Sequence, residues 1–245
     1  MIICLINPNT TRNMTKTIEA VAKETASAKT KIIATNPNDG PESIEGYYDE
    51  VFCIPGIIEK VQAYKNADAY IIACFDDTGL DAVRTITNKP VLGIGNSSFN
   101  IASLLAGSFS VITTLEVSVP ILKHNLLKYG FDRMCVNVSS VQIPVLDLKK
   151  QSNDCLRALE KEVERTLDED KAEAVVLGCA GMADFATKLE EKFAVPVIEG
   201  VSASVILAEG LVRIKKNTSK VGGYSYPREK KYSGIYKSFE FKKLS

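Results

Sequence analysis

Two of the six cysteines in this sequence, Cys74 and Cys179, lie at positions that suit acid/base chemistry. Each directly follows a short apolar run, residues 69–73 and 174–178. A thiolate can remove a proton from one face of a carbon, and a thiol on the opposite face can return a proton to it. Two opposed cysteines therefore have the chemistry that inversion of a stereocentre requires.

An internal repeat relates the positions of the two cysteines. Residues 67–74, ADAYIIAC, align with residues 172–179, AEAVVLGC, at an offset of 105. Two further strand-like segments, 4–6 and 90–92, align with 110–112 and 196–198 at an offset of 106. A nearly constant offset predicts two similar lobes. If these face each other across a cleft with pseudo-two-fold symmetry, the two thiols face each other as well.

The elements that must position these residues alternate between short apolar runs and helical patterns. Strand-like runs fall at residues 2–6, 31–34, 69–74, 91–94, 109–113, 174–178 and 197–198, and helical patterns fall at 11–28 and 201–214. Apolar runs separated by helices are typical of parallel strands that are covered on both faces. The sequence therefore predicts an α/β fold with two similar lobes, each a parallel sheet flanked by helices. Ligands of such sheets bind beyond the carboxyl ends of the strands.

The division into lobes also follows from the repeat. We predict lobe one at residues 1–97 and lobe two at 98–207, with the segment 208–245 returning to lobe one. Residues 213–245 carry ten Lys and Arg against two Glu, while the rest of the chain carries 20 basic against 28 acidic residues. We expect this basic tail, which holds four tyrosines, to pack on its own acidic body or on a neighbouring subunit. Contact with RNA is the alternative.

Composition excludes several classes of protein. A formal net charge of zero argues against nucleic-acid binding, and no apolar run approaches the roughly 18 residues that a membrane span needs. The N-terminus lacks the features of a signal peptide, which predicts a cytoplasmic protein with reduced thiols. Without a His cluster, a Cys-x-x-Cys pair, a phosphate loop or a dinucleotide fingerprint, we expect neither metal nor cofactor. The single histidine, His124, is expected on the surface.

Four cysteines, Cys4, Cys53, Cys135 and Cys155, are interpreted as small apolar residues of the core. For Cys74 and Cys179 we instead expect a helix start directly after each cysteine, at residues 77–78 and 180–181. A helix dipole at that place would favour the thiolate, and Asp76 and Asp77 would serve as helix caps. A disulfide between the two cysteines is the alternative.

The segments around these residues resemble the aspartate/glutamate/hydantoin racemase superfamily, and within it the branch of hydantoin and allantoin racemases. The resemblance covers nearly the whole chain, in the segments 6–10, 40–50, 73–81, 109–115, 143–148 and 176–183 and at Thr218, Ser219, Lys220, Pro227 and Lys230. It implies a cofactor-independent racemase that inverts C5 of a 5-substituted hydantoin, such as allantoin. It also implies that Cys74 and Cys179 are the two bases, in a cytoplasmic homo-oligomer of purine catabolism.

The same resemblance implies a set of substrate-binding residues: Asn9, Thr10, Ile44, Phe75, Asp76, Gly95, Thr113, Thr114, Ala180 and Gly181. One departure is the run GNSS at 95–98, where a more acidic and alanine-rich run is expected. No residue of the set is basic, which favours a neutral ring over a free acidic amino acid as the small-molecule substrate. A cis–trans isomerase, an amino-acid racemase, a decarboxylase and a non-catalytic bilobed sensor remain alternatives.

Overall fold

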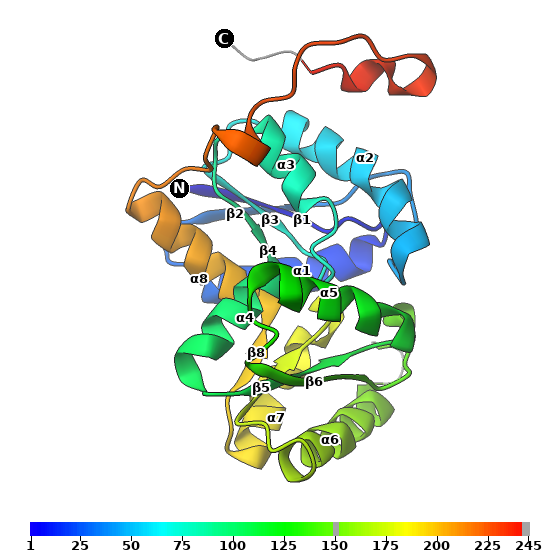
Figure 1. The fold of residues 1–245 in the computed structure, drawn as a ribbon, viewed down its shortest axis with the longest axis vertical. Coiled ribbons are helices and arrows are strands. Elements are labelled where there is room, and N and C mark those ends of the chain that lie inside the picture. Colours follow the sequence, from blue (N-terminus) through cyan, green and yellow to red (C-terminus); the bar gives the residue numbers. More distant parts are fainter. Residues whose placement is uncertain (149–151, 242–245) are drawn as a thin grey trace.

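The computed structural model describes residues 1–148 and 152–241 and contains two four-stranded parallel sheets (Figure 1). The first sheet has the order β2-β1-β3-β4, built from β1 (Ile2–Ile6), β2 (Lys31–Thr35), β3 (Ala69–Ile72) and β4 (Val91–Gly93). The second has the order β6-β5-β7-β8, built from β5 (Phe109–Thr113), β6 (Cys135–Ser140), β7 (Ala174–Leu177) and β8 (Val197–Glu199). The two orders correspond strand for strand, which confirms the predicted α/β fold of two similar lobes.

Helices cover both sheets. Those of the first half are α1 (Arg12–Thr25), α2 (Tyr47–Ala63), α3 (Leu80–Ile86) and α4 (Ile94–Leu105). Those of the second half are α5 (Val119–Tyr129), α6 (Ser152–Asp168), α7 (Ala186–Phe193) and α8 (Gly200–Arg213). Short 3-10 turns occur at Glu116–Ser118, Val145–Asp147, Ala180–Phe185, Gly222–Tyr224 and Gly234–Phe239. Within the described ranges no helix is long and apolar enough to cross a membrane.

Two helices exchange between the lobes. Helix α4 follows β4 of the first sheet and packs on β7 and β8 of the second, whereas α8 follows β8 and packs on β3 and β4 of the first. They also pack on each other, and Figure 1 shows both between the two sheets. A Cβ atom on Gly200 would lie 2.7 Å from the Cβ atom of Ile94, so the first turn of α8 needs a glycine there. The predicted lobe boundary at residue 97 falls inside α4, and the division itself stays a prediction.

One hydrophobic core continues from the first sheet into the second. It includes Leu5 of β1, Phe99 of α4, Phe109 of β5 and Val201 of α8, all fully buried. The ring of Phe99 stacks on Phe109 at 5.9 Å and meets Phe75 edge-on at 5.6 Å. This continuity fixes the two sheets against each other, and it places the ends of their strands face to face.

The chain after α8 runs along the first lobe. The backbone N–H of Thr218 donates to the carbonyl of Asn88 at 2.8 Å, and the Tyr224 hydroxyl donates to Asp81 at 2.9 Å. Arg84 donates to the same hydroxyl at 3.3 Å. At least one tyrosine of the basic tail thus packs on an acidic residue of its own body. The last residues of the predicted tail, 242–245, lie outside the described part of the chain.

Strand β6 is the strand that the sequence patterns miss. It is an edge strand with alternating, half-exposed and polar residues, so it lacks the continuous apolar run of a central strand. The third strand-like run also proves shorter than predicted, because β3 ends at Ile72. Cys74 therefore lies in the loop beyond the strand rather than within it.

Candidate active site

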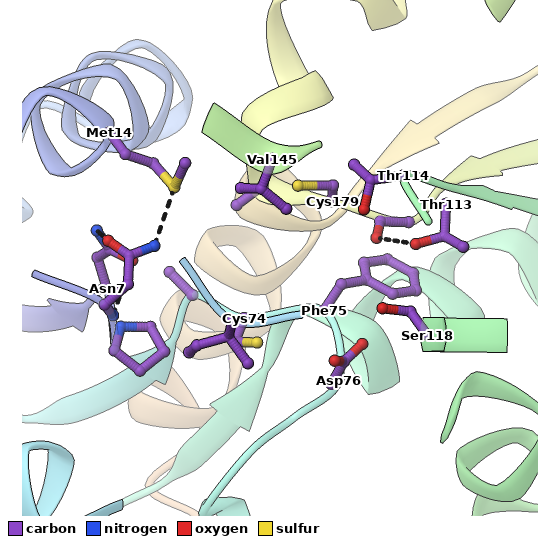
Figure 2. A pocket seen from close by; sticks show the side chains of 16 residues that line it. Asn7, Met14, Cys74, Phe75, Asp76, Thr113, Thr114, Ser118, Val145 and Cys179 are labelled. Carbon is purple, nitrogen blue, oxygen red and sulfur yellow. Dashed lines mark hydrogen bonds between the residues drawn. The ribbon is translucent and has the colours of Figure 1, made fainter. Parts of the chain in front are cut away.

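A pocket lies between the two lobes, at the carboxyl ends of β1, β3, β5 and β7 (Figure 2). Its lining residues are Asn7, Pro8, Asn9, Met14, Ile44, Ala73, Cys74, Phe75, Asp76, Thr113, Thr114, Ser118, Val145, Gly178, Cys179 and Ala180. Figure 2 shows Cys74 and Cys179 on opposite walls. The cavity is narrow, and its volume of about 40 Å³ is room for a few water molecules.

Most of the residues predicted for substrate binding line this pocket together with the two cysteines. They are Asn9, Ile44, Phe75, Asp76, Thr113, Thr114 and Ala180. They come from segments that are far apart in the sequence and meet because parallel strands bring their carboxyl ends to one edge. The placement agrees with the predicted site, while the role of each residue in binding stays a prediction.

Three predicted residues, Thr10, Gly95 and Gly181, lie outside the lining. The Thr10 hydroxyl donates to the carbonyl of Pro41 at 3.3 Å, so this side chain holds a neighbouring loop. Gly95 lies behind the wall, where a Cβ atom would meet the Phe75 carbonyl oxygen at 2.3 Å. Gly181 supports Cys179 through its backbone. These positions correspond to a second layer around the pocket rather than to its surface.

Several lining residues are not in the predicted set of substrate-binding residues, and they carry different signals. Asn7, Pro8 and Val145 belong to segments that carry the resemblance, and Gly178 directly precedes Cys179. Met14 of α1 and Ser118 have no distinguishing pattern in the sequence. They reach the pocket only because α1 and the turn Glu116–Ser118 each follow a central strand.

The two cysteines have matching backbone environments. The N–H of Asp76, two residues after Cys74, hydrogen-bonds the Cys74 sulfur and lowers the pKa of that thiol. The N–H of Gly181, two residues after Cys179, does the same for Cys179. The Thr78 hydroxyl also lies 3.7 Å from the Cys74 sulfur. Each lobe thus presents its cysteine with the same local contact, as the repeat implies.

Burial dominates the acidity of both thiols. It raises the pKa of Cys179 to about 12 and that of Cys74 well above its ordinary value. The negative charge of Asp76 raises both further. Both cysteines are therefore expected to be thiols near neutral pH. The expectation that a helix start favours the thiolate is wrong here, because desolvation outweighs the backbone hydrogen bonds.

The predicted helix starts differ on the two sides. On the first side, α3 begins only at Leu80, so Cys74 is not at a helix N-terminus. On the second side, Cys179 directly precedes the 3-10 turn Ala180–Phe185. Asp77 caps α4 instead of the helix that follows it, and its carboxylate accepts the N–H groups of Gly95 at 3.0 Å and Asn96 at 2.8 Å. Asp76 caps no helix, since its side chain lines the pocket.

An asparagine pair forms another wall of the pocket. The amide of Asn7 donates to the Asn9 side chain at 2.8 Å and to Thr15 at 3.0 Å, so its hydrogen bonds are used within the fold. The amide of Asn9 donates to the Met14 sulfur at 3.2 Å. A thioether is a weak acceptor. Of the two side-chain amides, that of Asn9 therefore loses less when it exchanges its present acceptor for the carbonyl oxygen of a substrate.

Two hydrogen bonds join the lobes beside the pocket. The backbone N–H of Val145 donates to Glu45 at 3.1 Å, and Ile44 and Val145 both line the pocket next to this contact. The Asn125 amide of α5 donates to the backbone carbonyl of Asp76 at 2.8 Å. These contacts hold the loops of the first lobe against the second.

The titratable residues outside the pocket offer no metal site within the described part of the chain. Over 1–148 and 152–241 no group of three or more His, Cys, Asp or Glu side chains could hold a metal ion. His124 of α5 is exposed, which confirms its prediction as a surface residue. Cys4, Cys53 and Cys155 are fully buried in the core and Cys135 is half-buried in β6, in line with their interpretation as structural residues.

The chain is similar in sequence and in structure to several known proteins. The family model described as Asp/Glu/Hydantoin racemase matches residues 3–208. The chain is 45% identical to a hydantoin racemase of Pseudomonas sp. (strain NS671), over 98% of this chain and 97% of the relative. It is 44% identical to a hydantoin racemase of Rhizobium meliloti, over 96% and 98%. An allantoin racemase structure from Klebsiella pneumoniae matches with a TM-score of 0.95 and 38% identity, over 98% and 99%.

Proposed function

The chain belongs to the Asp/Glu/hydantoin racemase family, and on that premise we propose that it is a racemase that inverts C5 of a 5-substituted hydantoin without a cofactor. Allantoin is the leading specific substrate. The observation that carries the proposal is that Cys74 and Cys179, from equivalent positions of the two lobes, line one pocket. The hydantoin racemases and the allantoin racemase that the chain resembles over almost its whole length support it.

The proposed reaction transfers a proton across the ring carbon. One thiolate takes the C5 proton, and the electrons of that C–H bond move into the adjacent carbonyl to form an enolate. The opposite thiol then gives its proton to the other face of C5 and becomes the thiolate. No electron is gained or lost, and the enzyme returns to its starting charge with the roles of the cysteines exchanged.

The pocket suits a neutral ring. Its lining contains no Lys, Arg or His within the described residues, so it has no cation to pair with the carboxylate of a free amino acid. The Asn9 amide, now on the Met14 sulfur, is positioned to donate to a ring carbonyl or to the enolate oxygen.

The experiment that tests the function follows optical rotation with no added cofactor. Single enantiomers of allantoin, of benzylhydantoin and of aspartate are incubated with the pure protein, with and without a metal chelator. Loss of rotation is expected for at least one hydantoin and not for aspartate, and alkylation of the thiols should abolish it. Racemisation of aspartate alone, or loss of activity on chelation that added metal restores, would contradict the proposal.

The presence of two cysteines in the pocket also helps to distinguish the alternative functions. Decarboxylation needs only one of them, and a binding protein needs neither. A cis–trans isomerase would use both, but its substrate carries no stereocentre for the polarimetric assay to follow. Turnover of a hydantoin therefore separates the racemase from all three.

We also propose that the protein is a homo-oligomer. Four large apolar side chains, Tyr47, Tyr48, Val51 and Phe52, are exposed along the first turns of α2. Clustered apolar groups of this kind on a surface are typical of interfaces between subunits. Light scattering of the pure chain measures the mass in solution, and a monomer would contradict this part of the proposal.

The rate of racemisation is expected to rise with pH. Burial holds the pKa of Cys179 at about 12 and that of Cys74 well above its ordinary value. Below these pKa values, the fraction of thiolate rises about tenfold for each unit by which the pH is raised. The measurement is kcat/KM between about pH 7 and pH 9, after subtraction of the spontaneous rate, which also rises. A flat profile over this range would show that a thiolate is already present at neutral pH.

The remaining cysteines are expected to affect stability and not chemistry. Replacing Cys4, Cys53, Cys135 or Cys155 by alanine removes a packed sulfur from the core or from β6, at a cost of about 1–3 kcal/mol in the free energy of unfolding. Urea unfolding measures this cost, and optical rotation measures the activity, which should persist. An inactive but folded variant at any of these positions would assign that cysteine to the reaction.

A further inference from the structure

Asp76 places a carboxyl group in the pocket that no mechanism step above uses. It is 8% exposed, it lines the pocket, and Figure 2 shows it near Phe75 and Ser118. Its backbone is held from the second lobe by the Asn125 amide. Within the described part of the chain, no group donates a hydrogen bond to its side chain. A buried carboxyl without such a donor is costly for the folded protein, which points to a role toward a ligand.

The charges around Asp76 are all of one sign. Glu50 lies half-buried beside it, hydrogen-bonded to Thr78, and Asp77 is its neighbour in sequence. The charge of Asp76 acts on both Cys74 and Cys179, so the carboxyl lies close to both walls between which C5 must be held. Every substituent of a ring held there lies within the field of this carboxyl, since the pocket is small.

We propose that Asp76 sets the charge selectivity of the site: hydantoins with a neutral, hydrogen-bond-donating or cationic group at C5 are accepted, and those with a carboxylate are rejected. The inference rests on the proposed function and goes beyond it, because it assigns the class of 5-substituent. An amide or ureido N–H supplies the hydrogen bond that the Asp76 carboxyl lacks. A carboxylate that enters the pocket loses its hydration, and the described lining residues include no cation to compensate for that loss.

Two substrates of nearly equal shape isolate this effect. 5-(2-Carbamoylethyl)hydantoin and 5-(2-carboxyethyl)hydantoin have the same number of non-hydrogen atoms and differ in charge. They are compared at about pH 9, above the pKa of about 8 that burial and the charges of Glu50 and Asp77 give Asp76. The protein is expected to favour the amide by about tenfold or more in kcat/KM, which corresponds to about 1.4 kcal/mol. Where either compound turns over slowly, its inhibition of allantoin racemisation gives the same ratio.

Variants test whether Asp76 is the cause. Asp76→Asn removes the charge with little change of shape and should bring the ratio close to one, whatever its effect on the common rate. If Asp76→Asn does not fold, the unchanged protein is compared at about pH 6 and about pH 9, and its ratio should fall toward one at the lower pH, where Asp76 is protonated. Asp132→Asn is the matched control, because Asp132 is exposed and outside the pocket. Its ratio should equal that of the unchanged protein.

The outcomes separate this inference from the proposed function. Equal use of both compounds by the unchanged protein would overturn the role of Asp76 while leaving the racemase intact. A preference for the amide that survives in Asp76→Asn, or that is as large at about pH 6 as at about pH 9 in the unchanged protein, would overturn it as well. Failure to racemise any hydantoin, allantoin included, would contradict the proposed function itself.

Discussion

Replacing either Cys74 or Cys179 by serine is expected to lower the rate of racemisation by about 10³-fold or more. A serine hydroxyl is far less acidic than a thiol, so it supplies no base on its side of the ring near neutral pH. Each cysteine lies on its own wall of the pocket, so we expect each to reach one face of C5 only. The loss should therefore be of similar size for the two variants, as measured by the optical rotation of allantoin.

Each of these variants should still remove the C5 proton from one face of the ring. In Cys74→Ser, Cys179 can still remove the C5 proton of the enantiomer whose C–H bond points toward it, and that proton returns to the same face. In D₂O this variant should exchange the C5 proton of one enantiomer with retained configuration, and Cys179→Ser should exchange that of the other. Mass spectrometry of each enantiomer measures the exchange, after subtraction of the spontaneous rate.

Cys135→Ser is the matched control for these measurements. It makes the same chemical change at a half-buried cysteine of β6, outside the pocket. It should racemise at a rate close to that of the unchanged protein and exchange both enantiomers. Equal exchange of both enantiomers by one of the active-site variants would contradict the opposed arrangement of the two cysteines.

The parts of the fold that could be predicted from the sequence are those that continuous apolar runs and the internal repeat determine. Parallel strands covered on both faces must be continuously apolar, so β1, β3, β5 and β7 are visible as apolar runs. The repeat then relates the two sheets. The return of the chain to lobe one was predicted from residue 208 onward, but the packing of α4 on the second sheet was not, because this helix is apolar on several faces and its sequence does not say which sheet it covers. Edge strand β6 was missed for the opposite reason, since half of it faces water.

The site was predictable to the extent that strand ends define it. Cys74, Asp76, Thr114 and Cys179 follow central strands and meet in the pocket. The acidity of the thiols was not predictable, because the pKa of a buried group depends on desolvation in three dimensions. The partner of Asp77 was equally hidden, since it is a helix that begins 17 residues further along the chain.

Asp77 is the residue outside the pocket whose loss is expected to disturb the site most. Its buried carboxylate accepts hydrogen bonds from the backbone of Gly95, from that of Asn96 and from the hydroxyl of Tyr129, the last at 3.0 Å. It thereby joins the loop after Cys74 to the first turn of α4 and to α5 of the second lobe. Removing it leaves two N–H groups and one hydroxyl without their acceptor in a dry environment.

Asp77→Ala is accordingly expected to lower the free energy of unfolding by about 3 kcal/mol, and turnover by about tenfold or more because the Cys74 loop loses its anchor. Tyr129→Phe removes one of the three hydrogen bonds and should cost about 1 kcal/mol. Asp154→Ala, which removes an exposed carboxylate paired with Arg157, should cost still less. Urea unfolding of the three variants measures this order. Equal costs for Asp77→Ala and Tyr129→Phe would mean that the cap of α4 contributes nothing, and the loop would then be held by the packing of Phe75 on Phe99 instead.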